Sequence, residues 1–434
     1  MTGFRVRLSF KVGLLWLLLV AGWLMSACQS QLKWEADPRL VVPAGAVARV
    51  LAEGDPGPSS FDPELVPPIP QPSGLRPCCA LGSDLRVALG AIPVPGIRLS
   101  NVIGLEELGP HNYDNGTLAF EGSYAGAPPI TAEKNGLVYT CRGGFVDTAH
   151  VRDYADWTVF FVAAVARHLL TGGVIELPSE GARRRAVIRP LDASFVERHG
   201  ALSVVVPMAA WLSFQISIWH EIATWYGWHA IRGWPEELSA FSPEDVFSNV
   251  LGIRIAAGLI EAQATPSEDV YNHNMTWWIH EVLRDLDAVS PKLAREALAQ
   301  VDGVWWDSHA RLPSRDLVRR RSIAIGSTLA PWLASDVAPE EDPSGPLAER
   351  CSRSRDRAVL PMPEELFGIP IRDIATLEIE VGEALSERFR FPRPEGRWIT
   401  QEDFPRILRA VRAEAVEFFG PAATLPHRSP TVEE

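Results

Sequence analysis

Cysteine and lysine are both scarce in this chain. Five Cys among 434 residues are too few for a disulfide-built scaffold, and no CxxC pair indicates a zinc ribbon. Lys occurs at only four positions (11, 33, 134 and 292), so almost all positive charge is Arg, and the net charge is −13. Because nucleic-acid affinity rests on neutralising phosphates, this acidic chain is not expected to have a nucleic-acid partner.

Several catalytic and nucleotide-binding motifs are also missing. The chain has no GxSxG elbow, no GxxxxGK[ST] loop and no GxGxxG turn. Its hydrophobic fraction of 47% and charged fraction of 22% exclude the disordered, collagen-like and coiled-coil classes. What remains is a globular protein with a sizeable core.

The N-terminus reads as a secretory signal. Arg5, Arg7 and Lys11 precede an apolar run of about fourteen residues, and the segment LMSAC ends in Cys28. This end resembles the lipobox of bacterial lipoproteins, which implies cleavage before Cys28 and its modification by acyl chains such as palmitate. The expected partner is therefore a membrane, reached through lipid on Cys28. Gln29, in place of Asp, implies the outer membrane, facing the periplasm. An ordinary signal peptide or an N-terminal membrane anchor are the alternatives.

The remaining cysteines suit an oxidising compartment. A bond from Cys141 to Cys78 or Cys79 is the expected pairing, because the periplasm permits disulfides and neighbouring cysteines rarely bond to each other.

The patterning along the chain predicts an α+β protein that is mainly helical, with a central bundle of about four helices, a small β-hairpin and an irregular N-terminal segment. We divide it into a signal peptide (1–27), a Pro/Gly-rich tether (28–77), a helical core (78–335), a C-terminal α+β segment (336–420) and a disordered tail (421–434). The expected core elements are a strand at 136–141, helices at 145–170, 203–229, 242–264, 265–289 and 290–301, and a hairpin of 174–178 with 186–190.

Three blocks carry a family resemblance: CRGGFVDTAHVRDYADWT (141–158), HEIATWYGW (220–228) and FSPEDVFSNVLGIRIA (241–256). They resemble a family of bacterial lipoproteins catalogued only as a domain of unknown function. That resemblance implies no activity.

The first block places Asp147, His150 and Asp153 one helical turn apart, so that neighbours in this series can point into one site. Asp156 and Arg152 are expected to form an exposed ion pair. Asp147 and His150 are the better candidates for a metal ligand or an acid–base pair. The alternative is a solvated helix face.

The second block begins like the zinc-protease motif HExxH, but Thr224 replaces the second His. His220 and Glu221 nevertheless interrupt an otherwise apolar helix. A buried unpaired carboxylate is costly, so Glu221 needs a partner or a wet cavity. A structural ion pair with an Arg such as Arg254 is the alternative. We expect His150 to lie within about 8 Å of His220 or Glu221, a margin that allows for relaxed apo geometry.

Three weaker candidates lie further along the chain. His273 and His280 are two turns apart, too far to share one metal directly. Asn249 breaks an apolar pattern and can orient a ligand or cap a neighbouring backbone, and Gly252 permits close helix approach.

Two functions follow from these patterns. The first is a non-enzymatic binding or assembly factor of the envelope with buried polar networks. The second is a hydrolase that uses zinc or another divalent metal between the 145–170 and 203–229 helices, with His150 and His220 as ligands and Glu221 and Asp147 as catalytic groups. Substrate and metal identity stay open.

Overall fold

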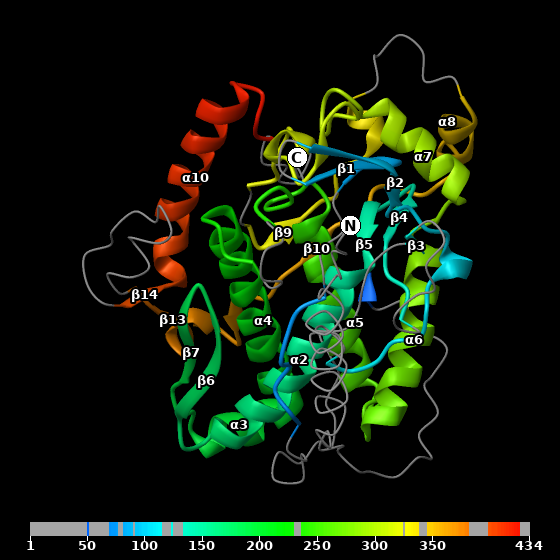
Figure 1. Ribbon diagram of the computed structural model, residues 1–434. Coiled ribbons are helices and arrows are strands. Elements are labelled where there is room, and N and C mark those ends of the chain that lie inside the picture. The colour runs from blue at the N-terminus through cyan, green and yellow to red at the C-terminus, as the bar shows by residue number, and fades with distance from the viewer. Residues whose placement is uncertain are drawn as a thin grey trace, which may run out of the picture. The chain divides into compact units, whose positions relative to one another are not determined.

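Four helices form the centre of the computed structural model (Figure 1): α2 (Thr148–His168), α4 (Ala201–Trp225), α5 (Asp245–Glu261) and α6 (Glu268–Asp285). Helix α2 packs against both α4 and α5, and α5 also packs against α4 and α6. The expected bundle of about four helices is confirmed.

The structure describes residues 50–51, 69–76, 81–89, 92–114, 123–124, 133–229, 236–323, 326–337, 345–381 and 398–425. The expected signal peptide, Cys28, most of the tether, Cys78, Cys79 and most of the expected tail lie outside these ranges.

Helix α4 is the most apolar element. Almost all of its residues are buried, as its uninterrupted hydrophobicity predicts. Within the described residues it is the one helix long and apolar enough to cross a membrane, but 89% of that apolar window is buried inside the protein. A core helix of a globular protein accounts for both properties.

The predicted hairpin is confirmed as β6 (Gly173–Glu180) and β7 (Ala182–Ile188), which are antiparallel. Two C-terminal strands, β13 (Ala375–Glu380) and β14 (Trp398–Thr400), extend it into a sheet of order β14-β13-β7-β6. The C-terminal helix α10 (Phe404–Phe419) follows this sheet and contacts α4. The sheet therefore joins the C-terminal segment to the helical core.

The other strands form small sheets, consistent with a mainly helical α+β fold. The larger has the order β3-β2-β1-β8, from Ser123–Tyr124, Ile92–Ser100, Leu85–Leu89 and Arg311–Leu312. The pairs are β4 (Leu137–Thr140) with β5 (Gly144–Asp147), β9 (Thr328–Leu329) with β10 (Leu360–Pro361), and β11 (Glu365–Leu366) with β12 (Ile369–Pro370). Three further α-helices in the described residues are short: α3 (Ala193–His199), α7 (Pro291–Gln300) and α8 (Pro346–Cys351).

Two helix starts that carry site residues differ from the sequence prediction. Residues 145–147 belong to β5, and α2 begins only at Thr148, with Asp147 as its N-cap. Helix α5 begins at Asp245 rather than after a Ser242 cap. The Ser242 hydroxyl donates to Glu244 instead, and the Ser242 N–H donates to Asp245 Oδ2 at 2.9 Å. The Ser242 hydroxyl is thus bonded to a side chain and accepts from no backbone N–H of α5 within the described residues.

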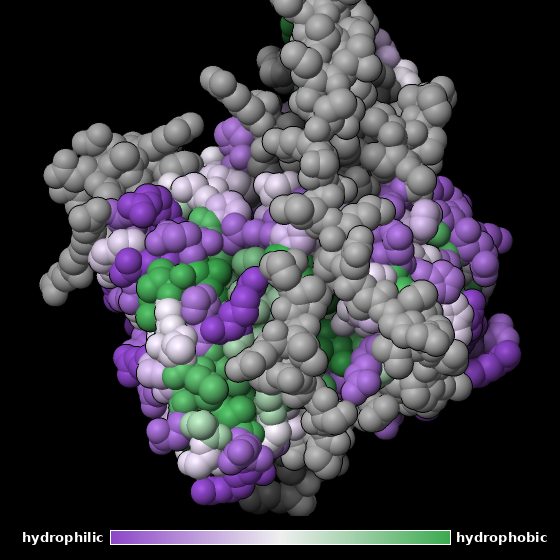
Figure 2. Space-filling view, turned by 90° about the horizontal axis from the view of Figure 1, so that it is seen from below, coloured by the Kyte–Doolittle hydropathy of each residue, from purple (hydrophilic) through white to green (hydrophobic). Residues whose placement is uncertain are grey.

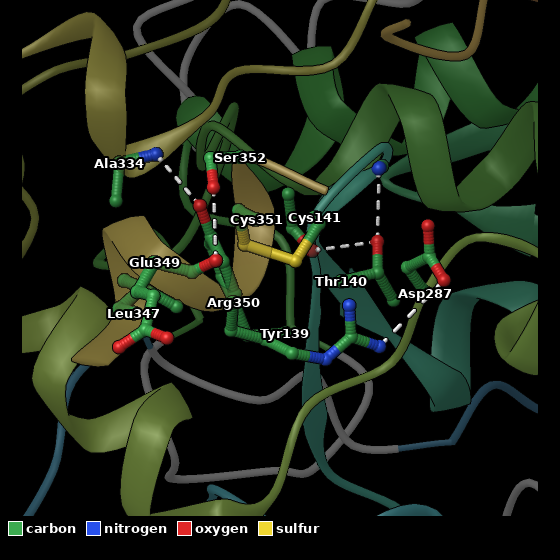
Figure 3. Close-up of a disulfide and its surroundings, with 12 residues drawn as sticks. Tyr139, Thr140, Cys141, Asp287, Ala334, Leu347, Glu349, Arg350, Cys351 and Ser352 are labelled. Atoms are coloured by element: carbon green, nitrogen blue, oxygen red, sulfur yellow. Dashed lines mark hydrogen bonds and ion pairs between the residues drawn. A yellow bond between two sulfur atoms is a disulfide. The ribbon is translucent and has the colours of Figure 1, made fainter. Parts of the chain in front are cut away.

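The disulfide also differs from the prediction: Cys141 bonds to Cys351, not to Cys78 or Cys79 (Figure 3). The bond joins the turn between β4 and β5 to the end of α8, across 210 positions of sequence. Arg350 beside it pairs with Asp287 at 3.6 Å. No local pattern in the sequence indicates that Cys351 lies near Cys141. The two meet because α8 packs on α7, which in turn packs on β4.

Large exposed hydrophobic side chains are few among the described residues: Ile92, Leu170, Val174, Trp277, Phe367 and Phe418. Figure 2 shows one face, on which hydrophobic patches lie between hydrophilic areas.

Candidate metal centre

Asp147 holds the first turn of α2 and orients His150. One of its carboxylate oxygens accepts from the Ala149 N–H at 2.8 Å, as an N-cap does. The other lies 2.9 Å from Nδ1 of His150. A carboxylate accepts hydrogen bonds, so Nδ1 of His150 donates, and Nε2 becomes the ring nitrogen able to bind a metal.

His220, on α4, has a matching arrangement. Its Nδ1 lies 2.5 Å from Oε1 of Glu180, the last residue of β6. Burial alone would lower the pKa of His220, but the Glu180 carboxylate raises it above its ordinary value. Glu180 also pairs with Arg184, which helps keep it ionised. Nδ1 of His220 therefore donates, and Nε2 is again the nitrogen available to a ligand.

Glu221 completes the group. Its Oε2 accepts from the N–H of Phe241 at 2.5 Å, and its Oε1 lies 3.8 Å from Nε2 of His150. Phe241 has a φ of 58°, a left-handed conformation that bulky residues rarely adopt. The alternative partner Arg254 donates instead to the carbonyl oxygens of Val50 and Pro361.

One ligand atom each from His150, His220 and Glu221 lies within 4.8 Å of the others. The two imidazole rings are 6.2 Å apart between centroids. The expected convergence of the two sequence blocks within 8 Å is thus confirmed. Two His nitrogens and one carboxylate are a known ligand set for Zn²⁺ and Fe²⁺.

Sequence reasoning missed three acidic members of this cluster: Glu180, Glu244 and Asp245. Oδ1 of Asp245 lies 3.9 Å from Nδ1 of His150, and Asp147, His150 and Asp245 form a second group of closely spaced ligand atoms. Burial raises the pKa of Glu244 to about 7, and burial together with Glu221 raises that of Asp245. The segment SPED (242–245) has the pattern of a helix start, and that pattern does not reveal the burial of its two acidic residues.

Unsatisfied polar atoms concentrate on the residues of this cluster and its neighbours in sequence. Within the described residues, fifteen buried side-chain atoms have no hydrogen-bond partner, and six of them lie here: Glu221 Oε1, Thr224 Oγ1, Glu244 Oε1, Asp245 Oδ1 and both amide atoms of Asn249. Buried polar atoms are normally paired, so such a concentration indicates a bound ion or water. A cation would also offset the excess of carboxylates over His and Arg here.

Asp153 does not join this group. It accepts from the backbone N–H and from the guanidinium of Arg76, at 2.9 and 2.8 Å. Asp156 also binds Arg76, and Arg152 pairs with Glu133, so the expected exposed Asp156–Arg152 pair is wrong. All five side chains are buried in one charge network.

The other candidates from the sequence are not among the closely spaced ligand groups. His273 is exposed and His280 half-buried on α6, and neither belongs to the closely spaced ligand groups. Asn249 is fully buried on α5, one turn after Asp245. Gly252 meets the prediction of close helix approach: a Cβ there would lie 2.0 Å from the backbone oxygen of Val151.

A family model described as "Protein of unknown function (DUF4056)" matches residues 66–335. This is more than half of the chain, so the chain belongs to that family. The matched region spans β5, α2, β6, α4 and α5 and contains every residue of the cluster. No curated protein and no solved structure matches the chain.

Proposed function

We propose that this protein is a metal-dependent hydrolase of the bacterial cell envelope, with a Zn²⁺-type centre held by His150, His220 and Glu221. The single observation that carries the proposal is the shared arrangement of the two His residues. Each Nδ1 is held by a carboxylate, Asp147 or Glu180, which leaves Nε2 of each ring for a metal, and the ligand atoms of the two His residues and Glu221 lie within 4.8 Å of one another. Carboxylate–His–metal arrangements of this kind orient ligands in established zinc sites.

Three protein ligands leave a coordination position for water. A metal held there would lower the pKa of a water molecule and so supply a nucleophile for hydrolysis of a carbonyl or phosphoryl group. Asp245, a buried carboxylate that interacts electrostatically with both Glu221 and His150, would accept the proton of the attacking water and pass it to the departing group.

The low exposure of the cluster favours a second candidate. His150 and His220 are only 5% and 7% exposed, which suits a metal or a polar network with a purely structural role. In that case the protein is a non-enzymatic binding or assembly factor.

We further propose that lipid on Cys28 anchors the protein to the outer membrane, facing the periplasm. The lipobox-like segment LMSAC supports the anchor. The bond between Cys141 and Cys351 supports an oxidising compartment, because such bonds are rare in the cytosol.

Elemental analysis of the purified mature protein tests the metal proposal. About one equivalent of zinc or iron is expected in the wild type and in His273→Ala, the matched control at an exposed His. His150→Ala and His220→Ala should contain almost none. Hydrolysis of ester, peptide and phosphoester model substrates, lost on chelation and restored by metal, separates the hydrolase from the structural candidate. Metal without turnover would favour the latter.

A further inference from the structure

A pocket of about 530 Å³ lies between helices α4 and α10, lined by residues of both. These two helices contact each other and are drawn in green and red in Figure 1. The volume is typical of a pocket for a small organic ligand. None of the proposed metal ligands lines it, so the inference stands independently of the proposed function.

The apolar part of the pocket comes from both helices. Phe214 on α4 and Phe404 and Leu408 on α10 line it, and all three are buried. These side chains offer an aromatic or aliphatic group of a ligand a surface that excludes water.

Gln215 places an amide in this apolar surrounding. It lines the pocket and is only 4% exposed, yet its side chain makes no hydrogen bond within the described part of the chain. Trp211, one turn earlier on α4, has a buried indole N–H that is likewise unpartnered there. A buried donor without a partner, such as the Trp211 indole N–H, is costly, so together with the Gln215 amide it indicates a ligand with matching polar groups.

The remaining polar lining is richer in positive than in negative charge. It holds Arg372, Arg409 and Arg412 against Glu364 and Glu402, in a chain whose net charge is −13. Arg372 lies 3.9 Å from Glu402, and Arg412 donates to the carbonyl of Ile323. Arg409 is exposed and makes no hydrogen bond or ion pair within the described residues. It can therefore bind a carboxylate through two parallel hydrogen bonds.

We propose that this pocket binds a peptide C-terminus that ends in an apolar residue. The terminal carboxylate would pair with Arg409, the last amide group would hydrogen-bond Gln215, and the last side chain would lie against Phe214, Phe404 and Leu408. An acyl amino acid is the smallest compound that carries all three groups.

The probe is N-acetyl-L-phenylalaninate, titrated into the full mature protein labelled with 5-fluorotryptophan. The fluorine resonance of Trp211, assigned by Trp211→Phe, reports on the pocket. Two matched compounds dissect the contacts: N-acetyl-L-phenylalaninamide lacks the charge, and 3-phenylpropionate lacks the amide group. Each should bind about tenfold more weakly, the loss expected for one hydrogen bond to a charged or buried partner.

Two variants and a control complete the experiment. Arg409→Gln should weaken the binding of the carboxylate probe about tenfold, so that it binds no more tightly than the neutral amide. In Gln215→Leu, N-acetyl-L-phenylalaninate should bind no more tightly than 3-phenylpropionate. Arg406→Gln, on the same helix but outside the pocket, should change neither. Unchanged resonances of the other Trp residues establish that each variant is folded.

The proposal is overturned if the Trp211 resonance does not move at saturating probe, or if the neutral amide binds as tightly as the carboxylate. Equal losses of probe affinity in Arg409→Gln and Arg406→Gln would also overturn it, because they would show that the probe is attracted to the positive surface in general.

Discussion

Asp147 caps helix α2 with one carboxylate oxygen and holds Nδ1 of His150, 2.9 Å away, with the other. The same residue thus fixes the start of the helix and the orientation of the imidazole that the helix presents to Glu221. Stability and metal binding are therefore linked at this residue, but a conservative change can separate them.

Asp147→Asn is the change that separates the two roles. Asn caps helices about as well as Asp, so the stability should change little. Its amide cannot replace the carboxylate toward His150, so metal affinity should fall about 10–100-fold, as for other outer-shell carboxylates. Competition with a chromophoric chelator measures this. Asp192→Asn, at the N-cap of α3 away from the cluster, is the control, and equal affinities in all three proteins would contradict the assigned role.

The bond between Cys141 and Cys351 should contribute strongly to stability. It closes a loop of 210 positions, and loops of this length are expected to give about 2–5 kcal/mol. Cys351→Ser should lower the free energy of unfolding in urea by that amount, and the double variant Cys141→Ser/Cys351→Ser should lose about as much. If reducing agent lowers the stability of the wild type and of Cys351→Ser equally, the bond is not the cause.

Gly252→Ala should destabilise the contact between α5 and α2. The added Cβ would lie 2.0 Å from the backbone oxygen of Val151, and backbone cannot move aside as a side chain can. We expect a loss of about 1–3 kcal/mol, as for other overpacked cores, although Ala favours helices more than Gly does. Gly258→Ala on the same helix is the comparison, because its nearest neighbour is the Trp278 side chain at 2.9 Å. Thermal unfolding of both variants should show the larger loss for Gly252→Ala.

The charge network around Arg76 should make stability depend on acid pH through Asp156. Burial would raise the pKa of Asp156, but His111 and Arg76 lower it below its ordinary value. A carboxyl whose pKa is lower in the folded state stabilises the fold above its unfolded pKa of about 3.9 and loses that contribution as the pH falls through the folded pKa.

Asp156→Asn therefore provides the test. At pH 7 it should cost about 3–5 kcal/mol, because it leaves Arg76 and His111 buried with less compensation. The difference from the wild type should narrow below about pH 4. Urea midpoints between pH 3 and 7 measure it, with Asp84→Asn as an exposed control. A difference that stays constant over this range would show that ionisation of Asp156 is not responsible.

Much of the fold was predictable because local patterns decide it. Helix α4 follows from its apolar composition, and Ser290 caps α7 as expected. Four site residues were also predictable: Asp147, His150, His220 and Glu221. His220 and Glu221 are polar groups inside an apolar helix, and they need compensation that another polar block can supply.

The rest depends on contacts that no local pattern encodes. Glu180 reaches His220 across 40 positions only because the β6–β7 hairpin packs beside α4, and Cys351 reaches Cys141 across 210. Asp245 was hidden for another reason. Its sequence context is that of an ordinary helix start, and only the fold reveals that its carboxylate is buried beside His150.

The most direct test of the central claim is to locate a bound metal. Crystals of the mature protein grown with Zn²⁺, measured at the zinc absorption edge, should show one strong anomalous peak. It should lie about 2.0–2.2 Å from Nε2 of His150, Nε2 of His220 and a carboxylate oxygen of Glu221. A map without a peak there, with His150 and His220 bound only to Asp147 and Glu180, would contradict the account.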